Sequence, residues 1–215
     1  MRHLEGGRWK KAEKAAAQAA DEAARTLWAR AEAASLLAEL ALYRAVAEIN
    51  LGREREAIWH WQTSLGLWPA IAERPLEGWG EAARLAQHPL RRAGEMPPGI
   101  SPVDDLDLLR LEPAELDYGD GPTVDNPTAA RRGPHGEIRV EMVVDRDGML
   151  GSPRVLSEAA HPVLVYAMLD WLGELPPAEP ARLDGEPVDA LLTVAIDFDA
   201  SWSKGGLFLV PEDGR

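Results

Sequence analysis

Residues 136–148 read GEIRVEMVVDRDG. From residue 138 onward, apolar positions alternate with mixed ones, a period of two that predicts a β-strand with one buried face. The apolar positions are Ile138, Val140, Met142 and Val144. The Asp147-Gly148 pair that follows is typical of a tight turn between antiparallel strands. The stretch therefore predicts a β-hairpin whose sheet is covered on one side.

The residues that follow predict a return strand, one helix and a last strand. Residues 154–156 (RVL) return the chain beside the first strand, and Leu191–Phe198 form the last strand. Between them, residues 162–172 carry apolar side chains at helical spacing, and a proline in position 162 is tolerated in a first helical turn. We expect this helix to lay Leu164, Met168 and Trp171 on the sheet.

Taken in order, these residues resemble the C-terminal domain of the TonB energy-transducer family over about residues 121–199. The resemblance lies in residues 136–144, Asp147-Gly148, residues 153–157, His161-Pro162, Trp171, residues 176–178, Asp184-Gly185 with the Glu-Pro-Val after it, and residues 192–198. It implies a ββαβ domain that binds other proteins in the bacterial envelope without enzymatic activity. His161 is expected to be a structural residue at the start of the helix.

The resemblance also implies where a partner binds. In the family, the last strand lies where it can accept an extended peptide, because an unpaired edge offers main-chain donors and acceptors. This predicts partner contacts at Leu191, Thr193, Ala195 and Asp197. The alternative is that the edge is covered by the tail of residues 201–215, where Trp202 and residues 207–210 suit another short strand.

The first half of the chain predicts helices. Residues 7–68 lack proline and are rich in Ala, Leu, Glu and Arg. One helix is expected to end near Gly52, and Pro69 closes the next. The expected apolar stripe of the first of these helices is Leu36, Leu37, Leu40, Tyr43, Ala47 and Leu51, and the expected buried face of the second is Ala57, Ile58, Trp61, Leu65 and Trp68. The pattern indicates a three-helix bundle that resembles a tetratricopeptide repeat without a regular solenoid.

Most of the eight tryptophans fall in this helical half, where they suit core packing. Trp59 and Trp61 cannot both face the same side of one helix. We therefore expect Trp59 at an edge or surface, as a second candidate contact for a partner helix or peptide.

Composition divides the chain. Residues 1–95 have a net charge of +1 and the remainder −14, so the formal charge of −13 comes from the second part. We expect a helical bundle over residues 1–93, an acidic Pro/Gly-rich linker over 94–122 whose leucines dock in part, the TonB-C-terminal-like domain over 123–200 and a tail over 201–215. The fold class is α+β.

Charge and motifs bound the function. The acidic balance argues against nucleic-acid binding and favours a basic protein partner. The five histidines lack metal-ligand spacing, and no nucleophile or phosphate-binding motif is present, so we expect no enzyme activity, no cofactor and no metal. The prediction is an adaptor or scaffold of the envelope that binds partner peptides by strand addition, by a helical groove, or by both. The alternative is a structural subunit of a homo-oligomer or filament joined through edge strands.

Location follows from the start of the chain and its hydropathy. No segment reaches the roughly 18 to 20 apolar residues that span a bilayer. Residues 1–7 (MRHLEGG) do not lead into an apolar export segment. We expect a periplasmic or envelope location if an export signal was trimmed, and a cytoplasmic one if the chain is complete as written. The short acidic linker replaces the transducers' long spacer, so energy transduction itself is not expected.

Overall fold

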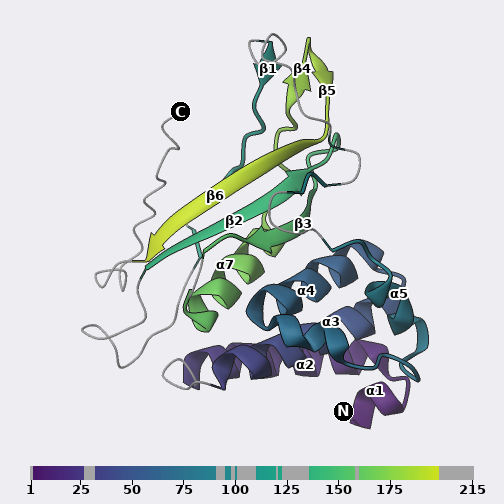
Figure 1. Ribbon diagram of the computed structural model, residues 1–215. Helices are drawn as coiled ribbons and strands as arrows, with labels where there is room; N and C mark the ends of the chain where they lie inside the picture. Colours follow the sequence, from purple (N-terminus) through teal and green to yellow (C-terminus); the bar gives the residue numbers. More distant parts are fainter. Residues whose placement is uncertain are drawn as a thin grey trace.

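A computed structural model describes residues 2–26, 32–90, 95–97, 100, 110–119, 121–122, 136–157 and 160–198. Helices occupy the first part of the chain, and antiparallel sheets occupy the second (Figure 1). The predicted α+β class is confirmed. The tail of residues 201–215, including the strand proposed around residues 207–210, lies outside the described residues.

The helical part is built from α1 (Arg2–Glu5), α2 (Trp9–Thr26), α3 (Ala33–Asn50) and α4 (Glu54–Leu67), followed by η1 (Pro69–Glu73), η2 (Gly80–Ala82) and α5 (Ala83–Ala86). The central helix α3 packs against both α2 and α4. Gly52 has a φ of +75°, a left-handed conformation that glycine adopts without strain and that separates α3 from α4 as predicted. The likeness to a tetratricopeptide repeat stays a prediction.

Two residues of the expected α3 stripe are exposed. Leu36 and Leu51 each leave 39% of their surface accessible, whereas Leu37, Leu40 and Ala47 are buried. Leu36 lies in the first turn of α3 and Leu51 follows its last residue. The apolar stripe is therefore buried in its middle part, whereas Leu36 and Leu51 remain partly accessible to solvent.

The predicted ββαβ unit consists of β2 (Gly136–Val144), β3 (Leu150–Val155), α7 (Pro162–Glu174) and β6 (Ala190–Phe198). The three strands form an antiparallel sheet in the order β3-β2-β6. In the turn between β2 and β3, the carboxylate of Asp145 accepts the N–H groups of Asp147 (3.0 Å) and Met149 (2.8 Å). Gly148 has a φ of +78°, a left-handed conformation that explains why glycine occupies this position.

Helix α7 covers one face of this sheet (Figure 1). It begins at Pro162, where Nδ1 of His161 accepts the N–H of Val163 at 3.3 Å, so His161 caps the helix. Leu164 and Met168 are buried against the sheet as predicted. Trp171 is half-buried, packs against the edge of the core and stacks on Tyr118.

A second, smaller sheet joins the linker to the C-terminal domain. Its strands are β1 (Leu111–Glu112), β4 (Arg182–Leu183) and β5 (Glu186–Pro187), in the order β1-β4-β5. An isolated bridge between Glu115 and Glu179 continues this pairing. Leu116 and Tyr118 pack against the core, so this stretch of the acidic segment docks on the domain.

The helical part and the sheet domain share one hydrophobic core. Helix α4 lies against β3 and α7. A Cβ built on Gly66 of α4 would lie 3.1 Å from Cγ2 of Val155, so a glycine allows the close approach. Ion pairs join the two parts, from Arg44 to Asp170 (2.9 Å) and from Arg55 to Asp145 (2.8 Å). The position of the helices on the sheet is thus fixed by packing and by charge.

Candidate functional site

The candidate binding site is the outer edge of β6. Among the described residues this strand pairs with β2 and with no other strand. Its register with β2 is unbroken from Gly136↔Phe198 to Val144↔Ala190. Figure 1 shows β6 as a long strand at the side of the sheet away from α4. The described edge is therefore long, regular and remote from the helical part.

The four predicted contact residues of β6 share one face. Val194 and Ile196 are buried beneath the sheet. Because side chains alternate along a strand, Leu191, Thr193, Ala195 and Asp197 lie on the opposite face and form the β6 contact set. The first three members are half-buried and Asp197 is exposed. The structure brings these four residues together on one surface of the sheet.

The hydrogen bonds of Arg139 show which way the main chain of β6 points. The N–H of Arg139 donates to Oγ of Ser157 (2.7 Å), and its carbonyl accepts the N–H of Leu156 (2.8 Å), so both groups face the β3 side. Main-chain groups of alternate residues in an antiparallel sheet point to opposite neighbours. The main-chain N–H and C=O groups of Ile138 and Val140 therefore point toward β6.

The same alternation applies across the pairing to β6. Ile138 pairs with Ile196 and Val140 with Val194, so the main-chain groups of these two β6 residues face β2. By the same alternation, the N–H and C=O groups of the β6 contact set point away from β2, toward the outer edge of the sheet. Among the described residues no strand meets these groups. They can pair with an added strand.

Charge is distributed unevenly over the face that carries the contact set. Glu137 and Asp197 are directly opposite each other, a repulsive cross-strand pair at one end of β6. Arg139 contacts Glu137 at 3.0 Å, and Arg154 contacts Glu141 at 2.9 Å. A partner strand bound here would meet an acidic residue near the end of β6.

The expectation that Trp59 is exposed is wrong. Its side chain is 6% exposed, and its Nε1 donates to the carbonyl of Leu169 in α7 at 3.1 Å. Trp61 is 2% exposed. The two residues do face different sides of α4, but both sides are covered, because α4 packs on α3 and also on α7 and β3. Trp59 is a contact between the two parts of the molecule.

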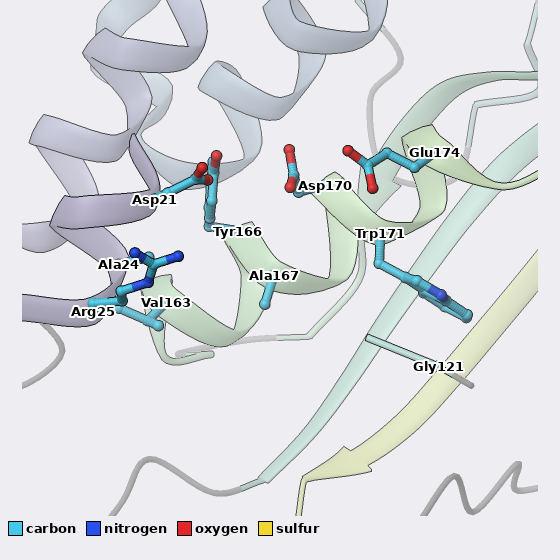
Figure 2. A pocket seen from close by; sticks show the side chains of 10 residues that line it. All are labelled: Asp21, Ala24, Arg25, Gly121, Val163, Tyr166, Ala167, Asp170, Trp171 and Glu174. Carbon is cyan, nitrogen blue, oxygen red and sulfur yellow. The ribbon is translucent and has the colours of Figure 1, made fainter. Parts of the chain in front are cut away.

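A groove between α2 and α7 was not predicted from the sequence. It has a volume of about 400 Å³ (Figure 2). Its lining includes Asp21 and Arg25 from α2, and Tyr166, Asp170, Trp171 and Glu174 from α7. The Tyr-x-x-x-Asp-x-x-x-Glu spacing on α7 could have indicated one polar stripe, because residues four apart share a helix face. The contribution of Asp21 depends on how the two parts dock.

Comparison with known families identifies the sheet domain. Residues 127–200, about a third of the chain, match the family model described as the Gram-negative bacterial TonB protein C-terminal. Members of this family belong to the bacterial envelope, and such domains interact with other proteins. Searches of the curated proteins and of the solved structures find no match. The predicted resemblance of this domain is confirmed.

In the part of the chain that the structure describes, no helix combines the length and apolar character needed to cross a membrane. Within the same residues, no three His, Asp or Glu side chains come together as a metal site.

Proposed function

We propose that the chain is a non-enzymatic adaptor of the bacterial envelope that binds an extended segment of a partner protein along the outer edge of β6. The observation that carries the proposal is the outward direction of the main-chain groups in the β6 contact set. Strand addition uses such groups for affinity and the neighbouring side chains for selectivity.

Charge supports a basic partner. The formal net charge is −13, and Asp197 carries an exposed carboxylate at the edge. A partner segment with a Lys or Arg opposite Asp197 would also relieve the repulsion between Asp197 and Glu137. Complementary charge raises the association rate and disfavours acidic competitors.

Photo-crosslinking tests this proposal. A photoreactive side chain is placed at Thr193, and a matched control carries it at Glu81, an exposed residue of η2 in the helical part. We expect the Thr193 position to crosslink one continuous segment of a single envelope protein, and the Glu81 position not to crosslink it. A product made of two copies of this chain would favour the structural-subunit alternative. Crosslinking to the same protein from both positions would argue against edge binding.

A further inference from the structure

The start of α2 carries a concentration of positive charge. Residues 8–14 read RWKKAEK, with four cationic side chains and one carboxylate. The four cations, Arg8, Lys10, Lys11 and Lys14, form what we name the α2 basic patch. All four are exposed, and their side chains make no hydrogen bond or ion pair with any described residue. The patch stands out in a chain whose formal net charge is −13.

The α2 basic patch lies on the outer face of the helix. The buried side of α2 is made of alanines, and the helix packs on α3. At 3.6 residues per turn, the three lysines lie on the opposite side. Lys14 is the neighbour of both Lys10 and Lys11, since residues three and four apart meet on a helix surface. The carbonyl of Arg8 accepts the N–H of Lys11 at 3.0 Å, which fixes Arg8 at the start of the same helix.

The one carboxylate within this stretch is already engaged. Glu13 forms an ion pair with Arg53 at 2.6 Å. Arg53 directly precedes α4, so this ion pair fixes the connection between α3 and α4 beside the first turns of α2. The same connection presents Leu51, which is 39% exposed. Glu13 therefore does not neutralise the lysines, and an exposed leucine lies on the neighbouring connection.

The charges of the patch work against the stability of α2. The start of a helix carries a partial positive charge, so lysines there are unfavourable, and like charges four residues apart repel each other. The first turn of α2 contains no acidic residue, and Lys10 and Lys14 are four residues apart. Helix formation therefore does not account for these lysines, whereas an anionic partner would.

The form of the patch favours a lipid surface as that partner. A convex helix face suits a plane of charge better than it suits one enclosed side chain. Three of the four cations are lysines, which act as flexible point charges, whereas the precise recognition of a single carboxylate favours arginine. Charges farther away than a screening length of about 8 Å interact weakly at physiological salt, so distant carboxylates of this chain oppose such binding little.

We propose that the α2 basic patch binds the surface of a bilayer that contains anionic phospholipids. The ammonium groups of the lysines lie among the headgroup phosphates, and the chain stays peripheral. Figure 1 shows α1, which directly precedes α2, and β6 at opposite ends of the view. A molecule bound in this way directs the edge of β6 away from the bilayer. The proposal rests on the envelope location proposed above but not on strand addition.

Vesicle sedimentation with the full chain tests the proposal. One set of vesicles is pure phosphatidylcholine, and the other contains equal parts of phosphatidylcholine and phosphatidylglycerol. We expect the protein to sediment only with the anionic set, and to be released when the salt is raised to about 0.5 M. The absence of binding to the anionic set, or equal binding to both sets, would overturn the proposal. Because β6 takes no part, that result would leave strand addition untouched.

A soluble polyanion separates lipid from protein as the partner. A polyglutamate peptide is titrated into the same protein without vesicles. We expect binding to this peptide to be weaker than binding to the anionic vesicles, because a bilayer presents many charges in one plane. Binding to polyglutamate without binding to the vesicles would assign the patch to an acidic protein and contradict the proposal.

Variants separate the patch from the overall charge. The double variant Lys10→Gln, Lys14→Gln should weaken vesicle binding at least about tenfold, because each lysine at an anionic surface contributes roughly fivefold. Its thermal midpoint should not fall, since a repulsion is removed. The control Arg110→Gln, Arg146→Gln removes the same charge from side chains that are 55% and 69% exposed. It should change binding less than about twofold, and equal losses in both variants would exclude a localised patch.

Fluorescent labels test the orientation. The chain has no cysteine, so one introduced cysteine can carry a single label. Ala15→Cys places the label on an exposed position next to Lys14, and Thr193→Cys places it on β6. Lipids that carry a quencher on the headgroup should quench the label at position 15 and leave the label at position 193 bright. Equal quenching at both positions would contradict the proposed orientation.

Discussion

The two outer strands of the same sheet differ in how well they can accept a further strand. β3 has six residues, contains Pro153 and is interrupted by a register shift against Glu141 and Val143 of β2. Its Ser152 adopts a φ of +49°. β6 has nine residues, no proline and an unbroken register. Proline, bulges and short length are devices that protect an edge from added strands.

The helical part reinforces this difference. Helix α4 packs on β3 through the close approach at Gly66, and the Arg55–Asp145 ion pair lies beside the turn that leads into β3. β6 runs along the other side of the sheet (Figure 1). The edge of β3 is thus irregular and covered by packing within the molecule, whereas the edge of β6 is regular. This asymmetry is what makes β6 the candidate for binding.

The largest expected effect comes from prolines placed on neighbouring residues of β6. In Val194→Pro the lost N–H faces β2, so a ladder bond and a buried side chain are both disturbed. The free energy of unfolding should fall by at least about 3 kcal/mol. In Thr193→Pro the lost N–H faces outward, and the cost should be about 1 kcal/mol or less. Urea denaturation followed by circular dichroism measures both.

This pair also checks the assigned direction of the main chain. If Thr193→Pro destabilised the protein as much as Val194→Pro, the outward groups would already be engaged, and the edge would be covered. If the edge is free, the crosslinking experiment is repeated with the photoreactive side chain at Ala195, with and without Thr193→Pro. Thr193→Pro should remove partner capture, because proline has no N–H to give to an added strand.

The second-largest expected loss of stability comes from a substitution in the turn before β3. An added Cβ on Gly148 would lie 1.9 Å from the carbonyl oxygen of Ala178, and its φ is +78°. Gly148→Ala should therefore cost about 2–3 kcal/mol, from backbone strain and a clash with rigid backbone. Gly185→Ala is the matched control, with a φ of +83° and no atom within 4 Å. It should cost about 1 kcal/mol, and equal costs in thermal unfolding would exclude the clash.

The third effect tests the contact that keeps the helices on the β3 side. Trp59→Phe removes the hydrogen bond to Leu169 and part of the buried ring, at a cost of about 1–2 kcal/mol. A Cβ on Gly173 would lie 2.7 Å from Nε1 of Trp59. Gly173→Ala should thus be destabilising alone but tolerated with Phe at position 59. A double-mutant cycle should show coupling above about 0.5 kcal/mol, and additive effects would mean that the two residues do not meet as described.

The sequence was sufficient where structure depends on neighbours along the chain. The alternation in residues 138–144, the Asp147-Gly148 turn and the proline after His161 each specify a local conformation, and all of them are present in the structure. In the structure the β6 contact set also shares one face, because side-chain direction follows directly from strand geometry.

Features that depend on docking could not be predicted. Trp59 is buried because α7 covers the side of α4 that an isolated bundle would expose. The pairing of Leu111–Glu112 with Arg182–Leu183 joins segments about 70 residues apart, and two-residue strands have no periodicity to recognise. The α2–α7 groove likewise combines Asp21 with Tyr166, which only the packing of the two parts brings together.

The smallest effect concerns the charge that β6 carries at its end. Asp197 faces Glu137 across the sheet, so Asp197→Asn should raise the free energy of unfolding by a few tenths of a kcal/mol. A charged residue on an exposed edge also discourages pairing between copies. The variant should therefore self-associate more readily, as light scattering over a concentration series would show, whereas Asp117→Asn, outside the three-stranded sheet, should not. Weaker self-association of Asp197→Asn would mean that the carboxylate promotes pairing between copies. Asp197 could then not be a charge that protects the edge of β6.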